Sequence, residues 1–275
     1  MIKVAITGWN GFIAQHLDKA LRKAEYSVVG IPRSILYDMP GIIRFMDFNK
    51  PEFIIHCASY GNNFSQDNDL ETIYANIIAT INLLEMTRDV PYKGFINFSS
   101  SSVGLPYETF YSATKASSER LVRAFVNKYH KPVFSVRPFT VIGSGEQEEH
   151  LIPTLIKSCL TGSEMPFVSE PVHDYIDVDD LCSAVLCLMQ YAEKLKGQII
   201  DIGTGVSTSN KKVKEIVEKL TRKKANCVEV KSMRPYDSEE WVADPEVLEF
   251  LGWVPKHRLE NTISEMVNVM IAGHR

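Results

Sequence analysis

A tyrosine and a lysine stand one helical turn apart in this sequence and follow a cluster of serines. Tyr111 and Lys115 have the i, i+4 spacing that places two side chains on one face of a helix. A nearby ammonium group favours the phenolate and lowers the tyrosine pKa from about 10. Such a phenol suits proton donation to a carbonyl oxygen during ketone reduction. A serine hydroxyl can hold that oxygen, and Ser100 is the first candidate, with Ser101 the second.

The position of this pair indicates its function better than its spacing does, because a Tyr-x-x-x-Lys spacing is expected by chance in a chain of this composition. The serines follow a predicted central strand, Phe95–Phe98, and the pair opens a helix predicted over Ser112–Tyr129. Ligands of doubly wound sheets bind outside the carboxyl ends of the strands. The sequence therefore predicts a catalytic group made of Ser100, Tyr111 and Lys115.

A glycine turn after the first apolar run is a second candidate site. Gly8 permits a sharp turn off the strand Lys3–Thr7. Gly11 leaves room for a pyrophosphate at the N-terminus of the following helix, and Ala14 allows that helix to pack closely on the strand. This pattern predicts the binding of a dinucleotide.

The end of the second predicted strand indicates which dinucleotide binds. Sites for NAD usually carry an acidic residue there, which holds the ribose 2′-hydroxyl. Here the chain reads GIPRS at 30–34, so the acid is missing and Arg33 is present. Because a guanidinium pairs well with a 2′-phosphate, NADP(H) is favoured over NAD. Asp47, placed after an abbreviated strand, is predicted to contact the adenine.

The elements that position these residues alternate between apolar strands and helices through the first half of the chain. This alternation predicts an α/β fold, a doubly wound parallel sheet of the Rossmann type with a smaller, discontinuous C-terminal substrate lobe. Only 21 residues lie between Ile31 and Phe53, so that edge of the sheet should be abbreviated. The predicted domains are a dinucleotide-binding domain over 1–143 and 172–204, and a substrate lobe over 144–171 and 205–275.

Composition excludes several other classes of protein. The formal net charge of −4 gives no basic face for nucleic acid. The five cysteines lack a Cys-x-x-Cys pair, so we expect neither a disulfide framework nor a metal site. Free thiols suit the cytoplasm, where we expect the protein to reside. No stretch approaches the ~20 apolar residues of a membrane span.

Further segments resemble, in order, the extended short-chain dehydrogenase/reductases, a family of NAD(P)-dependent nucleotide-sugar epimerases, dehydratases and reductases. The matching segments are TGWNGFI at 7–13, HCAS at 56–59, NIIATINLLE at 76–85, RPFTVIGSGE at 137–146, HDYIDVDDL at 173–181, IDIGTGVSTS at 200–209 and RPYDSEEWVADPEVLEFLGWVP at 234–255. The resemblance covers nearly the whole chain.

The resemblance implies roles for individual residues and a nucleotide-sugar as substrate. It gives Ser100, Tyr111 and Lys115 the family's Ser/Thr-Tyr-Lys roles. The cofactor-binding residues it implies are Gly8, Asn10, Gly11, Phe12, Ile13, Arg33, Asp47, Ala58, Tyr111, Lys115 and Pro138. The substrate-binding residues it implies are Ser101, Thr140, His150, His173 and Arg234. It also implies a homodimer formed through the helix that starts near Tyr111.

Departures from the family's pattern narrow the choice among the family's reactions. The family's sugar dehydratases follow their catalytic threonine with Asp-Glu, whereas Ser101 and Ser102 stand here, so dehydration is disfavoured. The short Ser100-to-Tyr111 interval resembles the small 4-ketoreductases of the family. We therefore expect NADPH-dependent reduction of a 4-keto group on a nucleotide-linked 6-deoxy sugar. Two alternatives stay open: an NAD-dependent 4-epimerase of a UDP-sugar, and a catalytically silent NADP-binding sensor.

Overall fold

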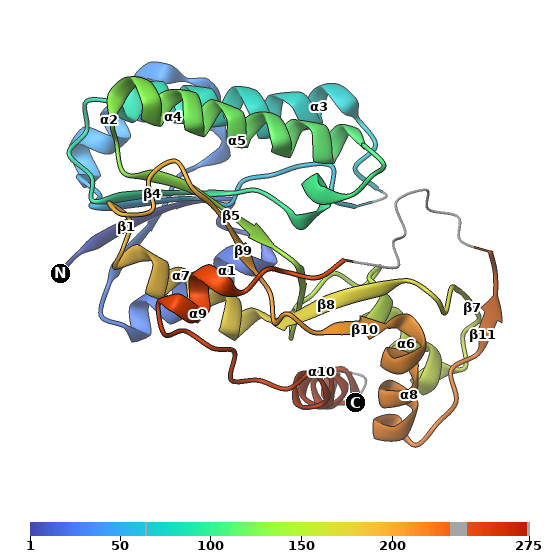
Figure 1. Cartoon of the computed structure of the whole chain (residues 1–275). Coiled ribbons are helices and arrows are strands. Elements are labelled where there is room, and N and C mark those ends of the chain that lie inside the picture. The colour runs from blue at the N-terminus through green and yellow to red at the C-terminus, as the bar shows by residue number, and fades with distance from the viewer. Residues whose placement is uncertain (64, 232–240, 274–275) are drawn as a thin grey trace. The chain divides into compact units, whose positions relative to one another are not determined.

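The chain divides into two compact units in a computed structural model that describes residues 1–63, 65–231 and 241–273 (Figure 1). Unit 1 consists of Met1–Gly104, Glu108–Pro138 and Cys182–Asp201. Unit 2 consists of Leu105–Tyr107, Phe139–Leu181 and Ile202–Arg275. Both units are therefore built from separate stretches of the chain.

A six-stranded sheet with the order β2-β1-β3-β4-β5-β9 forms the centre of unit 1. Its strands are β1 (Lys3–Thr7), β2 (Ser27–Gly30), β3 (Phe53–His56), β4 (Gly94–Phe98), β5 (Val133–Pro138) and β9 (Ile199–Ile202). The pairs from β2 through β5 are parallel. Every residue of β3 and β4 is buried, as expected for parallel strands covered on both faces. The doubly wound fold class predicted from the sequence is confirmed.

Helices cover this sheet and connect its strands. They are α1 (Phe12–Lys23), the 3-10 turn η1 (Arg33–Tyr37), α2 (Met39–Asn49), α3 (Asp69–Ile73), the π-helical turn η2 (Tyr74–Ile78), α4 (Ala79–Thr87), the 3-10 turn η3 (Ser101–Gly104), α5 (Phe110–Tyr129) and α7 (Val178–Met189). In Figure 1, α2, α4 and α5 lie over one face of the sheet, and α1 lies on the opposite face. Elements η2 and α4 continue α3, so the helical segment after β3 contains a π turn.

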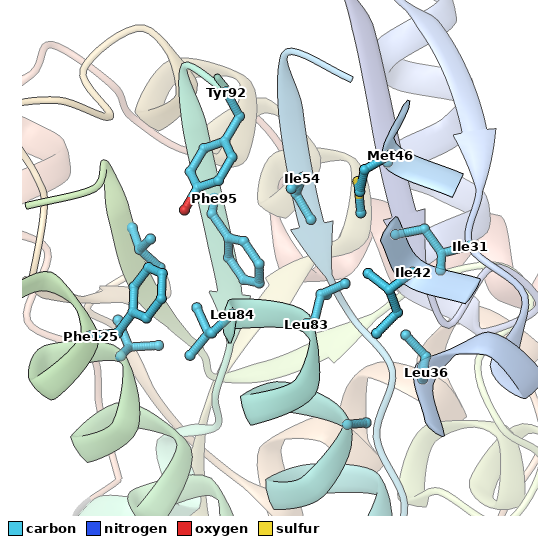
Figure 2. Packing of buried hydrophobic residues seen from close by; sticks show 14 of the residues in the cluster. Ile31, Leu36, Ile42, Met46, Ile54, Leu83, Leu84, Tyr92, Phe95 and Phe125 are labelled. Atoms are coloured by element: carbon cyan, nitrogen blue, oxygen red, sulfur yellow. The ribbon is translucent and has the colours of Figure 1, made fainter. Parts of the chain in front are cut away.

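The core under α2, α4 and α5 is aliphatic and aromatic (Figure 2). Leu83 and Leu84 of α4 point toward the sheet, where Ile54 of β3 and Phe95 of β4 meet them. These four side chains are 0% exposed. Burying an apolar side chain of this size stabilises a fold by about 1.5–3 kcal/mol, so this layer fixes the helices against the strands.

The edge of the sheet beside β2 is abbreviated, as predicted. The residues between Ile31 and Phe53 form η1 and α2 and contribute no strand, although all of them are described. The predicted position of Asp47 after a strand is wrong, because Asp47 is an exposed residue of α2. The reason lies in the i, i+4 pair Ile42 and Met46, which is buried and gives the segment a helical apolar face.

Unit 2 contains two small sheets. One has the order β10-β8-β6, formed by Ser207–Ser209, Val172–Asp177 and Thr140–Ile142, and the other pairs β11 (Cys227–Glu229) with β7 (Met165–Phe167). Its helices are α6 (Leu151–Thr161), α8 (Asn210–Thr221), α9 (Glu246–Phe250) and α10 (Leu259–Gly273). A second apolar cluster includes Leu155, Ile156, Val213 and Ile263, all buried.

A buried carboxylate joins separate segments of unit 2. Asp174 on β8 is 0% exposed and accepts hydrogen bonds from the backbone N–H groups of Thr204, Gly205 and Ala243. Because β8 pairs with β6 and β10, it belongs to unit 2, whereas the sequence grouped 172–204 with the dinucleotide-binding domain. The roles assigned to the two domains stay predictions.

Within the described part of the chain, no helix combines the length and the apolar character needed to cross a membrane.

The central packing layer gives a stability prediction. Replacing Phe95, which is 0% exposed, by alanine should lower the free energy of unfolding by about 3–5 kcal/mol, because the cavity cannot fully close. Phe48→Ala is the matched control, since that ring is 86% exposed and its loss should cost under about 0.5 kcal/mol. Urea denaturation of the two variants measures both values, and equal losses would contradict this assignment of the core.

Candidate active site

The start of α5 fixes where Tyr111 and Lys115 stand. Thr109 caps the helix: its Oγ1 accepts from the Ser112 backbone N–H at 3.0 Å, and the Thr109 N–H donates to Ser112 Oγ at 2.9 Å. This reciprocal capping box starts the helix at Phe110 and satisfies two backbone donors. Tyr111 therefore lies in the first turn, and Lys115 follows one turn later.

Lys115 is buried at the carboxyl end of β4. The residue is only 4% exposed, and its Nζ donates to the Phe98 carbonyl oxygen at 2.7 Å. Nζ also lies 5.8 Å from the centroid of the Tyr111 ring. Burial lowers the pKa of Lys115 to about 8, while the negative charge of Glu119 opposes this shift. A buried ammonium beside a phenol is the electrostatic arrangement expected from the sequence.

The phenol of Tyr111 is half-buried and has two hydroxyl neighbours. Burial raises its pKa, while hydrogen bonding with the hydroxyls of Ser100 and Ser59 lowers it. The sequence assigned the lowering of this pKa to Lys115. In the structure, burial gives the larger effect and the pKa is raised, so that expectation is corrected. The reason is that removing a phenolate from water costs more free energy than hydrogen bonds from the two hydroxyls recover.

Within the serine cluster at 99–102, Ser100 is the residue whose hydroxyl interacts with the phenol. Its Oγ also lies 2.9 Å from Ser102 Oγ and accepts from the Ser102 backbone N–H at 3.2 Å. Ser101, the second candidate, is 6% exposed at the start of η3. The structure thus brings Ser100, Tyr111 and Lys115 together, in the combination predicted from the sequence.

A buried polar chain that the sequence did not predict connects the glycine turn to this site. His56 Nδ1 lies 2.8 Å from Thr7 Oγ1, and His56 Nε2 lies 3.0 Å from Thr80 Oγ1. Burial lowers the pKa of His56 to about 3, so the ring is neutral. Thr80 donates its own proton to the Asn76 carbonyl, so it accepts from Nε2–H. Nδ1 then accepts from Thr7, whose oxygen also accepts the Ala58 N–H at 2.9 Å.

Asn76 extends this run of hydrogen bonds to α5. Its side-chain oxygen accepts from the Tyr60 N–H at 3.0 Å, and its amide donates to the Tyr60 carbonyl at 2.9 Å. The same amide donates to Thr114 Oγ1 at 2.9 Å, and Thr114 donates to the carbonyl of Tyr111. Asn76 lies in the π turn η2 and is 1% exposed. It therefore fixes the position of the loop after β3 relative to the first turn of α5.

The glycine turn fits the phosphates of a dinucleotide. Gly8 has φ +68°, and a Cβ on it would lie 2.8 Å from the Ala58 nitrogen, so only glycine fits there. Gly11 is the N-cap of α1, and no side chain caps that helix. The first N–H groups of α1 are thus left for a ligand, and a helix N-terminus favours an anion. Asn10, exposed in this turn, and Phe12 and Ile13, the first residues of α1, complete the predicted phosphate segment.

The remaining predicted cofactor residues lie in different parts of unit 1. Ala58 contacts Gly8 directly, and Pro138 is buried at the end of β5. Arg33 begins η1 just after β2. Its Nη2 forms an ion pair with Glu71 Oε2 at 2.8 Å, and the arginine side chain is 67% exposed. The Trp9 indole packs against Gly30 at the end of β2, where a Cβ would lie 2.8 Å from the ring. Asp47 lies on α2, as described above.

Three of the predicted substrate residues, Thr140, His150 and His173, belong to unit 2. Thr140 Oγ1 lies 3.3 Å from His173 Nδ1, so the structure brings these two together across β6 and β8. His150 Nδ1 lies 2.9 Å from Glu146 Oε1, whose side chain is 3% exposed. Burial raises the pKa of Glu146. Arg234 lies outside the described residues.

Comparison with known proteins places this geometry in context. The profile of the NAD dependent epimerase/dehydratase family matches residues 4–203. The chain is 28% identical to the GDP-6-deoxy-D-talose 4-dehydrogenase of Aggregatibacter actinomycetemcomitans, over 91% of this chain and 92% of that protein. It is 25% identical to the CDP-abequose synthase of Salmonella muenchen, over 97% of each.

Solved structures show the same fold. The UDP-glucose 4-epimerase of Thermotoga maritima, solved with UDP-glucose, superposes with a TM-score of 0.88 and 22% identity, and the match covers 100% of both chains.

The neutral His56 gives a pH prediction. Its pKa is about 3 in the folded protein and 6.5 when unperturbed, so the unfolded chain binds the extra proton between these values. Stability from the neutral ring is complete above pH 6.5 and is lost as pH falls toward 3. The stability advantage of the wild type over His56→Gln should shrink by about 1.4 kcal/mol per pH unit in that window. Urea denaturation from pH 7 to pH 4 measures it, and a pH-independent difference would refute the assignment.

Proposed function

Because the chain belongs to the NAD dependent epimerase/dehydratase family, we propose that it is an NADPH-dependent reductase of the 4-keto group of a nucleotide-linked 6-deoxy sugar. One observation carries this proposal: the phenol of Tyr111 is hydrogen-bonded to Ser100 and has the buried Lys115 one turn away. Those groups supply a proton donor, a holder of the carbonyl oxygen and a positive charge.

Each side chain has a distinct task. Ser100 donates a hydrogen bond to the sugar's carbonyl oxygen, and Tyr111 gives its proton to that oxygen as negative charge develops there. Lys115, still largely protonated at neutral pH with a pKa of about 8, stabilises the resulting phenolate. A nicotinamide dinucleotide supplies the hydride. Gly8, Gly11 and the N-terminus of α1 hold its phosphates, and Lys115 also bonds its ribose.

The choice of NADPH rests on Arg33. No acid stands at the end of β2, where the chain runs from Gly30 through Pro32 to Arg33. Arg33 pairs with Glu71, but both side chains are substantially exposed, at 67% and 46%. Exposed ion pairs contribute about 0–1 kcal/mol. A 2′-phosphate, which a guanidinium binds with two hydrogen bonds, therefore competes with Glu71 at little cost.

The 4-position and the 6-deoxy sugar are supported by the relatives. One matches over nine-tenths of the chain and acts, by its name, on position 4 of GDP-6-deoxy-D-talose. Ser101 and Ser102 replace the Asp-Glu pair of the family's dehydratases. This replacement favours ketone reduction over a reaction that eliminates water. We assign the nucleotide-sugar to Ser101, Thr140, His150, His173 and Arg234. A homodimer and a cytoplasmic location complete the proposal.

A second candidate is an NAD-dependent 4-epimerase of a UDP-sugar. It is favoured by the full-length structural match to a UDP-glucose 4-epimerase. The two candidates differ in redox balance. The reductase consumes one NADPH per sugar, whereas the epimerase returns the hydride to its substrate and needs no added reductant.

The reductase assignment gives a prediction for Tyr111→Phe. The wild type should oxidise NADPH with at least one member of a panel of GDP-, CDP-, dTDP- and UDP-linked 4-keto sugars. Tyr111→Phe should lower kcat by about 10²–10⁴-fold, because the proton donor is removed while the ring remains. Loss of NADPH absorbance measures both rates.

Other outcomes separate the alternatives. Turnover of UDP-sugars by purified protein with bound NAD and without added NADPH would indicate the epimerase. Binding of NADPH without turnover of any keto sugar would indicate the silent sensor. Equal rates for the wild type and Tyr111→Phe would overturn the catalytic assignment.

The cofactor assignment gives a separate prediction for Arg33→Ala. Losing a charge-assisted hydrogen bond of about 1.5–3 kcal/mol should raise the Kd for NADPH about 10–100-fold and leave the Kd for NADH nearly unchanged. Glu71→Gln is the matched control, because it removes the competing carboxylate and should keep or improve NADPH binding. Isothermal titration measures both constants, and equal losses for NADPH and NADH would contradict the role of Arg33.

A further inference from the structure

We propose that Trp9 is a further binding residue for the dinucleotide, and that its indole packs against the adenosine half of that ligand. The proposal rests on the proposed function, since it requires a nicotinamide dinucleotide at the glycine turn. Gly8 and Asn10, on either side of Trp9, belong to the predicted cofactor-binding residues. Trp9 itself carries a large aromatic side chain that the binding of phosphates does not explain.

The backbone of Trp9 is fixed by a tight turn. The Gly11 N–H donates to the Gly8 carbonyl oxygen at 2.8 Å, which makes Trp9 and Asn10 the two central residues of a β-turn. The side-chain amide of Gln15 donates to the Asn10 carbonyl oxygen at 3.0 Å and ties this turn to α1. The Cα atom of Trp9 is therefore held just beyond the end of β1.

The indole extends from this turn to the last residue of β2. A Cβ on Gly30 would lie 2.8 Å from Cδ2 and Cε3 of the Trp9 ring and 3.1 Å from its Cγ, so the ring rests on the Gly30 backbone. The two strands are neighbours there, because Ile6 pairs with Gly30 and its carbonyl oxygen accepts the Ile31 N–H at 2.8 Å. Any larger residue at position 30 would displace the ring. A glycine in a strand often marks such a close approach.

The ring occupies the interval that the adenosine of a bound dinucleotide spans. In a doubly wound sheet the pyrophosphate binds at the turn after the first strand, and the adenosine ribose is held at the end of the second strand. Trp9 begins in the first of these places, and its indole ends on Gly30, in the second. The ring therefore bridges the two points that the adenosine half of the ligand connects.

The chemistry around the ring suits an adenosine that carries a 2′-phosphate. A base stacks on an aromatic side chain because every base has a π-face, and Trp9 offers a neutral aromatic surface. Arg33, the only charged residue in the segment 27–34, follows Gly30 by three positions. The indole thus meets the base, and the guanidinium meets the phosphate. An acidic side chain at position 30, which would repel that phosphate, is incompatible with the ring resting there.

The first test is the binding of dinucleotides, which needs no sugar. Trp9→Ala should raise the Kd for NADPH and the Kd for NADH by the same factor of about ten, because both ligands carry the same base. Arg33→Ala, in contrast, should weaken the binding of NADPH alone. Trp9→Phe should keep both constants within about threefold of the wild type, since it keeps an aromatic face. Isothermal titration gives all of these constants.

A double-mutant cycle tests whether the indole rests on Gly30. Gly30→Ala alone should raise both Kd values, because its Cβ displaces the ring. In the Trp9→Ala background the same change should have almost no effect, since no ring is left to collide with it. Gly104→Ala is the matched control, because a Cβ on Gly104 would meet nothing within 4 Å. Thermal unfolding checks the fold of each variant, and Gly30→Ala decides the same point if Trp9→Ala does not fold.

Tryptophan emission gives a second readout with a ligand that lacks the nicotinamide half. Adenosine 2′,5′-bisphosphate should change the emission of the wild type. The change should disappear in Trp9→Phe and persist in Trp253→Phe. Trp253 is the matched control because it is 9% exposed and belongs to unit 2.

The outcomes separate this proposal from the proposed function. If Trp9→Ala binds both dinucleotides as tightly as the wild type does, the proposal is wrong, whatever the enzyme reduces. Unequal losses for NADPH and NADH, or an emission change that persists in Trp9→Phe, would place the ring away from the base and refute the proposal as well. If the equal losses are found but no keto sugar is reduced, the reductase assignment fails while the contact between Trp9 and adenosine stands. A wild type that binds neither dinucleotide would end both.

Discussion

The site depends on one buried run of hydrogen bonds, from Thr7 through His56, Thr80, Asn76 and Thr114 to the backbone of Tyr111. Each donor and acceptor along it has a partner, and the roles are consistent only when the imidazole is neutral with its proton on Nε2. Buried polar groups without partners are costly, so a fully satisfied chain favours one arrangement over its near alternatives. It connects β1, β3, the helix after β3 and α5, and it does so without any exposed ion pair.

This run of hydrogen bonds explains how the Tyr111 backbone and the glycine turn, from distant stretches of sequence, keep a fixed spacing. Parallel strands alone allow their C-terminal loops many conformations, because nothing in a strand ladder restrains the residues beyond its last hydrogen bond. Here the loop after β3 is restrained at Ala58 by Thr7 and at Tyr60 by Asn76. The π turn at 74–78 contributes to the same restraint of the loop, since the buried Asn76 that makes these bonds lies within it. Such turns are frequent at functional sites.

The sequence predicted the strands, the glycine turn and the Ser100–Tyr111–Lys115 group, because each depends on local apolar runs or on spacing within one element. It did not predict the role of Asn76, whose side chain contacts Tyr60, 16 positions away, and Thr114, 38 positions away. A polar residue inside the apolar helix at 76–85 was the available signal for Asn76. Asp47 was misplaced because a short apolar segment suits a strand or a helix until the burial of Ile42 and Met46 decides it. The grouping of β8 depended on pairing with β6 and β10, which periodicity does not encode.

The capping box of α5 fixes the start of this helix independently of the residues that precede it. Thr109 and Ser112 start the helix through hydrogen bonds made within four residues, so the first turn of α5 does not rely on the preceding segment for its geometry. That segment, Leu105–Tyr107, groups with unit 2. Insertions, deletions or exchanges in that segment should therefore leave the first turn of α5 in place. The short stretch ahead of Thr109 is thus a position at which the length of the chain can change without displacing Tyr111.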